Sequence, residues 1–308
     1  MKMKFKVVAI GNPVYDEIIT PYLKTDGRVL SGCSTNAVLA ISKLGVRPVA
    51  LIGSVGKDHK ERFLSDLKKY GIDETVIVPA DETGGFKLIY DKSGDRTLDV
   101  LGIANKITRK DIPEDFLHAE FIAVGPILQE VDLDLIEWLK ESTTAKIFLD
   151  PQGLVRKVGS DGRIIRTADR KVMKKVMNYV DFVKPNEHES VVITGEKDPK
   201  KSAEILVDWG APVAIVTLAE RGSIVYDGAT FYKIPAYETF AKDSTGAGDT
   251  YMGTFIVEYG RTKNISESAL YASCGASMMV EQTGPDFVMT DDEIKKRRET
   301  IRNKLEVL

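Results

Sequence analysis

A chain of 308 residues with 43% hydrophobic residues can bury a large core, and its formal net charge of −3 lacks the basic excess typical of nucleic-acid-binding proteins. Its two cysteines, Cys33 and Cys274, are too few and too distant for a disulfide framework, and three scattered histidines disfavour a histidine-ligated metal. The sequence shows no apolar run of membrane-spanning length and no signal-peptide pattern. We therefore expect a cytoplasmic protein without nucleic-acid or membrane partners.

The first third of the chain alternates apolar runs with amphipathic stretches. The apolar runs predict strands at residues 5–11 and 48–53, and the amphipathic stretches predict helices at residues 36–44 and 59–70. The pattern then changes, because residues 85–101 contain two apolar segments around a polar turn. These segments predict a β-hairpin with strands at residues 85–90 and 96–101 and a turn at residues 91–95.

The remainder of the chain repeats strand and helix. Short apolar runs predict strands at residues 121–124, 147–149, 181–183 and 213–217, with helices between them at 133–140, 170–179 and 201–209. A hairpin is expected at residues 224–226 and 230–234, followed by helices at 248–259, 266–281 and 291–305. Strands separated by helices predict an α/β fold, a mostly parallel sheet with helices on both faces that binds ligands at the carboxyl edge of its strands. We interpret residues 1–308 as one domain with short lid segments near residues 17–31 and 85–101, the first of them a small hairpin of residues 19–21 and 28–30.

The most informative motif is Asp243-Ser-Thr-Gly-Ala-Gly-Asp249, a glycine-rich turn followed at once by an apolar helical segment. A helix that opens in this way presents free backbone N–H groups, here near Gly246, Ala247 and Gly248, and binds anions such as phosphate. Asp249 would repel a phosphate, but it suits a base that takes a proton from an attacking hydroxyl. The alternative is an ordinary helix start in which Asp249 complements the helix dipole.

Three further motifs contain polar residues at turns. Asn12 and Asp16 follow the first predicted strand, where Asp16 can accept hydrogen bonds from substrate hydroxyls. In the loop of residues 31–36, Gly32 allows close backbone approach, and Asn36 suits either a vicinal diol or a helix cap. Asn186 and Glu189 follow a strand and form either a capping box or an oxygen-rich site for Mg²⁺ and phosphates.

Together these motifs resemble the ribokinase-like (PfkB) carbohydrate kinase family, in order and over nearly the whole chain. The resemblance implies that Asp249 is the catalytic base and that Gly246, Ala247 and Gly248 hold the transferring phosphoryl group. It places Asp16, Gly32, Asn36 and Asn12 at the acceptor. It also places Asn186, Thr217, Gly222, Gly246 and Gly248 at the nucleotide, with Glu189 reaching the metal through water.

The chain departs from the family pattern in three places. Ser31 replaces a glycine of the acceptor loop, and Ala219 stands where the nucleotide loop usually has glycine. The lid segment is shorter than in typical ribokinases, which argues against a dimer formed through the lid. We expect a monomer or a homodimer.

The expected function is phosphoryl transfer from ATP, possibly ADP, with Mg²⁺, to a hydroxyl of a sugar, sugar phosphate, cyclitol or nucleoside. A nucleoside favours an aromatic wall near Tyr15, Phe86 or Tyr90. A sugar phosphate favours cations, for which the candidates are Lys87, Arg96, Arg156 and Lys157. A nucleotide-sensing module without catalysis is the alternative from another class, whereas a dehydrogenase is disfavoured because no Gly-x-Gly-x-x-Gly follows the first strand.

Overall fold

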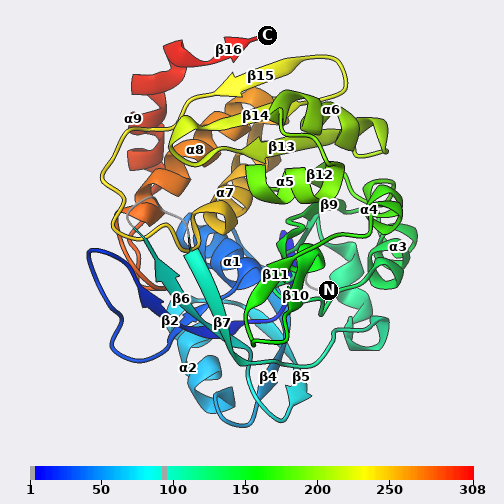
Figure 1. Cartoon of the computed structure of the whole chain (residues 1–308), viewed down its shortest axis with the longest axis vertical. Coiled ribbons are helices and arrows are strands. Elements are labelled where there is room, and N and C mark those ends of the chain that lie inside the picture. The colour runs from blue at the N-terminus through cyan, green and yellow to red at the C-terminus, as the bar shows by residue number, and fades with distance from the viewer. Residues whose placement is uncertain (1–3, 92–95) are drawn as a thin grey trace.

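The computed structural model describes residues 4–91 and 96–308, in which ten strands form one large sheet (Figure 1). In spatial order the strands are β16 (Glu306–Val307), β15 (Phe231–Ile234), β14 (Ser223–Tyr226), β13 (Val213–Thr217), β12 (Phe182–Val183), β9 (Lys146–Leu149), β8 (Phe121–Val124), β1 (Val7–Ile10), β4 (Val49–Gly56) and β5 (Glu74–Ala80). Neighbouring strands from β13 to β5 are parallel, and β14 to β16 extend the sheet antiparallel. The predicted α/β fold with a mostly parallel sheet is therefore confirmed.

Helices cover both faces of this sheet. They are α1 (Cys33–Lys43), α2 (Lys60–Tyr70), α3 (Leu133–Ser142), α4 (Arg170–Met177), α5 (Glu187–Thr194), α6 (Pro199–Asp208), α7 (Ala247–Thr262), α8 (Ile265–Val280) and α9 (Asp291–Ile301). The helices α1, α2, α7, α8 and α9 contribute to one hydrophobic core, and α3 to α6 contribute to the other. Among the described residues, no helix is both long enough and apolar enough to cross a membrane.

The division into two cores follows from the alternation of side chains along each strand. In β1, Val7 and Ala9 belong to the core on the α1 and α7 side, whereas Val8 and Ile10 belong to the opposite core. Both faces of the strand are buried, which explains why it reads as a continuous apolar run in the sequence.

The helices α1 and α7 pack closely because α7 carries a glycine at their contact. A Cβ atom on Gly253 would lie 2.5 Å from the carbonyl oxygen of Ala37, so any larger residue would push the helices apart. On the other side of α7, Phe255 packs edge-on against Phe148 of β9 and Phe182 of β12. These contacts fix where the first turn of α7 lies relative to α1 and the sheet.

A second sheet of four strands has the order β3 (Val29–Ser31), β2 (Val14–Ile19), β6 (Gly85–Tyr90) and β7 (Arg96–Gly102). The predicted pairing of β6 with β7 is confirmed, and the predicted turn at residues 92–95 lies outside the described residues. The small hairpin predicted at residues 19–21 and 28–30 is wrong in register. Pairing begins earlier, with Val14 opposite Ser31 and Asp16 opposite Val29.

The strands β5 and β16 at the edges of the large sheet were not predicted, and neither were two other β elements. The first is β2, because a Gly-Asn-Pro turn followed by acidic residues does not look like a strand, yet pairing with β3 and β6 provides its backbone hydrogen bonds. The second is the charged hairpin of β10 (Arg156–Val158) and β11 (Ile164–Arg166), which extends from the carboxyl side of β9.

Candidate active site

A cavity of about 690 Å³ lies between the carboxyl edge of the large sheet and the four-stranded sheet. Asp150, Lys184 and Thr217, at the carboxyl ends of β9, β12 and β13, line it from the large sheet. The four-stranded sheet contributes Asp16 of β2 and Phe86 of β6. This is the edge at which parallel α/β sheets bind ligands.

The turn before α7 opens onto this cavity. Gly246 is the residue before the helix and has φ 78°, a left-handed conformation that glycine adopts without strain. The Asp243 carboxylate accepts a hydrogen bond from the Thr245 N–H at 2.8 Å and holds the turn. Ala247 and Gly248 follow Gly246 along the cavity wall. The N–H groups of a first helical turn have no partners within the helix, so this wall suits an anion.

Asp249 lies in the first turn of α7, and neutral donors hold both of its carboxylate oxygens. Asn36 Nδ2 donates to Oδ2 at 2.9 Å, and Gln152 Nε2 donates to Oδ1 at 3.2 Å. Gln152 in turn accepts a hydrogen bond from the Arg156 guanidinium. Amide donors fix the orientation of the carboxylate without adding a positive charge that would weaken it as a base. The side chain of Asn36 therefore contacts Asp249, although the sequence assigned it to the acceptor.

Asp16 lies in β2 rather than in the loop expected for it, and its side chain lines the cavity. Its Oδ1 accepts a hydrogen bond from the Phe86 N–H at 2.8 Å. Burial raises the pKa of Asp16 to about 6, although this hydrogen bond and the charges of Arg96 and Arg156 act in the opposite direction.

Gly32 also lines the cavity, at the start of α1. It has φ 116°, and a Cβ atom there would lie 2.8 Å from the carbonyl oxygen of Asn12. Asn12 itself lies outside the large cavity. Its Oδ1 accepts from the Ser54 N–H at 2.8 Å and its Nδ2 donates to the Asn105 carbonyl at 2.9 Å, so its amide ties loops together. For this reason the acceptor site that we propose below does not include Asn12.

Asn186 and Glu189 form a reciprocal capping box at the start of α5. Asn186 Oδ1 accepts from the Glu189 N–H, and Glu189 Oε2 accepts from the Asn186 N–H, both at 2.9 Å. Both residues also line the cavity, so capping does not exclude a role at a ligand. Burial, reinforced by the neighbouring Asp150 charge, raises the pKa of Glu189.

Thr217 and Gly222 lie on the same wall, on either side of a short turn. A Cβ atom on Gly222 would lie 1.9 Å from the carbonyl oxygen of Ile234, so glycine is required there. Ala219 between them has φ 53°, a conformation that favours glycine. This value explains why a glycine would suit the position where the sequence has alanine.

Among the cavity residues that were assigned no role from the sequence are Asp150, Gln152 and Lys184. Lys184 Nζ lies 2.7 Å from Asp150 Oδ2, and both side chains are almost fully buried. The available signal was position, since Asp150 and Lys184 each follow a short apolar strand directly.

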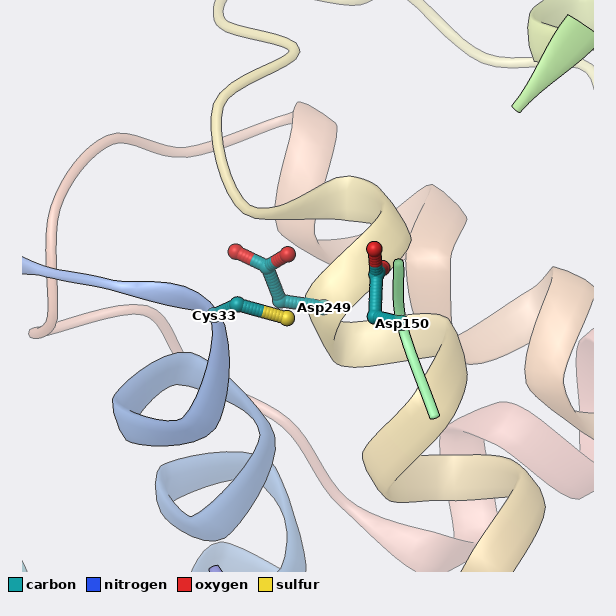
Figure 2. A group of neighbouring side chains, drawn as sticks. All are labelled: Cys33, Asp150 and Asp249. Carbon is teal, nitrogen blue, oxygen red and sulfur yellow. The ribbon is translucent and has the colours of Figure 1, made fainter. Parts of the chain in front are cut away.

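Figure 2 shows the Asp249 and Asp150 carboxylates near the Cys33 thiol, where α1 and α7 begin. Ligand atoms of the three residues lie within 4.8 Å of one another. Burial, followed by the charges of the two aspartates, raises the pKa of Cys33 well above its usual range. A thiol with a raised pKa is a poor nucleophile, as expected for a packing residue.

The structure also places the residues that were expected to distinguish acceptors. Phe86, Arg96 and Arg156 line the cavity. Tyr15 is instead fully buried and donates to Asp66 at 2.7 Å, and the Tyr90 hydroxyl lies 2.9 Å from Thr245 Oγ1. Lys87 and Lys157 lie outside the set of residues that line this cavity.

Comparison with known proteins agrees with this geometry. The model of the pfkB family of carbohydrate kinases matches residues 6–292. A cytidine kinase of Thermococcus kodakarensis is 31% identical over 268 residues, which is 85% of this chain and 91% of that protein. A ribokinase of Lactococcus lactis is 28% identical over 264 residues, which is 83% of this chain and 81% of that protein.

Among solved structures, a pyrophosphate-dependent kinase in the ribokinase family superposes with a TM-score of 0.81. It is 24% identical, over 94% of this chain and 99% of that one, and at this identity the likeness shows the fold alone. The family match covers nearly the whole chain, as the sequence motifs predicted. The chain therefore belongs to the pfkB family of carbohydrate kinases, transferases that phosphorylate hydroxyl groups of sugars and nucleosides.

Proposed function

We propose that Asp249 is the general base of a kinase that transfers the terminal phosphoryl group of a nucleotide, ATP or possibly ADP, to an acceptor hydroxyl. The observation that carries the proposal is the position of the Asp249 carboxylate, fixed by Asn36 and Gln152 beside the first N–H groups of α7. Asp249 takes the hydroxyl proton, the acceptor oxygen bonds to phosphorus, and the bond to the leaving nucleotide breaks. The N–H groups at Gly246, Ala247 and Gly248 stabilise the charge on the transferring group.

The acceptor lies between Asp249 and Asp16. An ionised Asp16 accepts hydrogen bonds from hydroxyls, and Gly32 lets the acceptor approach the start of α1 closely. These groups suit a polyhydroxylated acceptor such as a sugar, a cyclitol or the ribose of a nucleoside.

A sugar phosphate is the second candidate, because two guanidinium groups line the same cavity. Arg156 is 4% exposed, and its hydrogen bonds go to neutral oxygens, those of Gln152 and Ile127. Arg96 lines the cavity from the four-stranded sheet and donates to the neutral Tyr90 hydroxyl. Arginine binds phosphate well through paired N–H groups.

The residues present also fit a magnesium ion bound mainly through the nucleotide. Glu189 offers a buried carboxylate and Asn186 an amide on the cavity wall, and oxygen ligands of this kind suit Mg²⁺. When bound, the ion neutralises phosphate charge. Glu189 would hold it through water, while Thr217 and Gly222 line the nucleotide.

We further propose that the chain acts as one kinase domain, with the four-stranded sheet as its lid. Two contacts support this. Tyr90 reaches Thr245 beside the phosphate turn, and Thr20 Oγ1 donates to the Lys242 carbonyl at 3.1 Å. The lid is thereby tied to the loop that holds the donor end of the cavity, either in a monomer or in each copy of a homodimer.

The test is a coupled assay of donor consumption over matched acceptors. The panel pairs ribose with ribose 1-phosphate and ribose 5-phosphate, and adds myo-inositol and cytidine, each with ATP, ADP and pyrophosphate as donors. The proposal expects saturable turnover with at least one hydroxyl acceptor and a nucleotide donor. Turnover that Asp249→Asn leaves unchanged would contradict it. A preference for phosphorylated sugars that is lost in Arg156→Gln would select the second candidate.

A further inference from the structure

Lys184 and Asp150 form a buried ion pair in the wall of the cavity. Lys184 and Asp150 have side chains 3% and 4% exposed, and their charged atoms lie 2.7 Å apart. They follow the neighbouring strands β12 and β9. Removing two charges from water is costly, and an apolar pair of similar size often stabilises a protein as well or better. The pair therefore calls for an explanation beyond stability.

The position of the lysine relative to α7 is the second observation. Its Nζ lies 3.1 Å from the point where a Cβ atom on Gly248 would be, so the ammonium group touches the first turn of the helix. Both Lys184 and Gly248 line the cavity. The start of a helix carries a partial positive charge, which disfavours a neighbouring cation. A lysine fixed here is favourable only when negative charge lies beside it.

Asp150 supplies part of that negative charge in the free protein. Its Oδ2 lies 2.7 Å from Lys184 Nζ and forms an ion pair with the ammonium group. Asp150 also belongs to the group of Cys33, Asp150 and Asp249, whose ligand atoms lie within 4.8 Å of one another. Through Asp150, the Lys184 ammonium group therefore places a positive charge beside this group.

We propose that Lys184 is a further catalytic residue, whose ammonium group donates hydrogen bonds to the oxygens of the transferring phosphoryl group. Asp150 is its positioning residue and holds the ammonium group against the first turn of α7. The proposal rests on the proposed function, because it takes the phosphoryl group to lie at Gly246 to Gly248. Lys184 gives up no proton in the transfer. It stabilises charge on the phosphoryl oxygens beside the helix N–H groups.

The first experiment compares Lys184→Met with Lys184→Arg, using the acceptor found in the panel above. Loss of a preorganised donor to a transition-state charge typically lowers kcat by ~10²–10³-fold. We expect a loss of that size in Lys184→Met, with acceptor KM changed by less than about threefold. Lys184→Arg keeps the charge and should recover part of the loss. A kcat within about threefold of wild type in a folded Lys184→Met protein would overturn the proposal.

A second variant separates catalysis from stability, since Lys184→Met alone leaves Asp150 buried and unpaired. The double variant Lys184→Met/Asp150→Asn removes both charges, so its Tm should recover toward wild type. A purely structural pair predicts that activity recovers together with Tm. The catalytic role predicts that kcat stays low. Recovery of kcat with Tm would overturn the proposal.

A binding measurement supplies a readout other than turnover. Titrations with MgADP alone and with MgADP plus aluminium fluoride, a mimic of the phosphoryl group in transfer, compare the two states. We expect Lys184→Met to weaken the aluminium fluoride complex much more than MgADP, and equal weakening of both would contradict the proposal. Asp249→Asn, measured in parallel, reports on the proposed function itself. If Asp249→Asn does not lower turnover, the proposed function is contradicted. If turnover falls in Asp249→Asn but not in Lys184→Met, only the proposed role of the lysine is contradicted.

Discussion

Asn36 Nδ2 lies 2.9 Å from Asp249 Oδ2, which joins the first turn of α1 to the first turn of α7. The contact is possible because Gly253 lets α7 approach α1 closely at Ala37, the residue after Asn36. We therefore propose that Asn36 acts on the proposed base.

Asn36→Ala should therefore lower kcat more than it raises acceptor KM. A lost hydrogen bond to a charged group costs about 1.5–3 kcal/mol, which corresponds to a fall of roughly 10–150-fold if it acts on the base in the transition state. Steady-state kinetics measure this, and Asn178→Ala, which removes an exposed amide on α4's C-terminal side, is the control. A rise in acceptor KM with unchanged kcat would indicate instead that Asn36 binds the acceptor.

Acceptor binding should weaken as the pH falls through about 6. Burial raises the pKa of Asp16 to about 6, so the carboxylate is ionised and accepts hydroxyl hydrogen bonds above that pH, whereas it is protonated below it. Acceptor KM should rise below pH 6, while the affinity for the nucleotide changes little. Asp16→Asn should raise KM at pH 8 and abolish this pH dependence. If the dependence persists in Asp16→Asn, another group causes it.

Activity should require a divalent cation that binds weakly in the absence of nucleotide. The cavity offers Glu189 and Asn186 as oxygen donors, and Mg²⁺ of this kind is held largely by phosphates. Excess EDTA should abolish turnover, and Glu189→Gln should raise the Mg²⁺ concentration needed for half-maximal rate. Full activity in EDTA, or a metal that survives dialysis of the nucleotide-free protein, would contradict this prediction.

The lid should become ordered when the acceptor binds. It contacts the loop before α7 through Tyr90 with Thr245, Thr20 with Lys242, and the exposed rings of Tyr22 and Phe240, and it contacts β11 through Asp99 with Arg163. Glycines near its ends, at 27, 32, 84, 85 and 102, lie where hinges are expected, and a sixth, Gly94, lies outside the described residues. Closing a site in this way excludes water from phosphoryl transfer.

Hydrogen exchange on peptides that cover residues 17–31 and 85–101 would measure this closure. We expect nucleotide alone to leave exchange nearly unchanged and the acceptor to slow it. Tyr90→Phe, which removes the link to Thr245, should speed exchange in the free protein. Exchange that is unaffected by the acceptor would indicate a rigid, preformed site.

The sequence predicted the parts of this structure that depend on contiguous residues. The α/β alternation and the turn before α7 are both local, since apolar strand runs and a glycine-rich helix start can be recognised without knowing the fold. The strand β2 was missed because one of its backbone partners, β6, lies far along the chain, and because Asp16 and Glu17 are unusual in strands.

The site residues that were not predicted from the sequence were missed for the same reason. Gln152 reaches Asp249 and Lys184 reaches Gly248 only because β9 and β12 are neighbours in a sheet whose order differs from the chain order. Asn12 shows the converse. Its place after the first strand suggested a ligand contact. In the structure, its amide oxygen and nitrogen instead form hydrogen bonds with Ser54 and Asn105, which are distant in sequence.

The central claim is that Asp249 removes the proton from the attacking hydroxyl. The most direct measurement is kcat of Asp249→Asn with the preferred acceptor, together with nucleotide affinity by titration. The account predicts a fall of about 10²–10⁴-fold in kcat, the usual contribution of a general base, with nucleotide affinity and Tm close to wild type. Turnover at the wild-type rate would contradict the account.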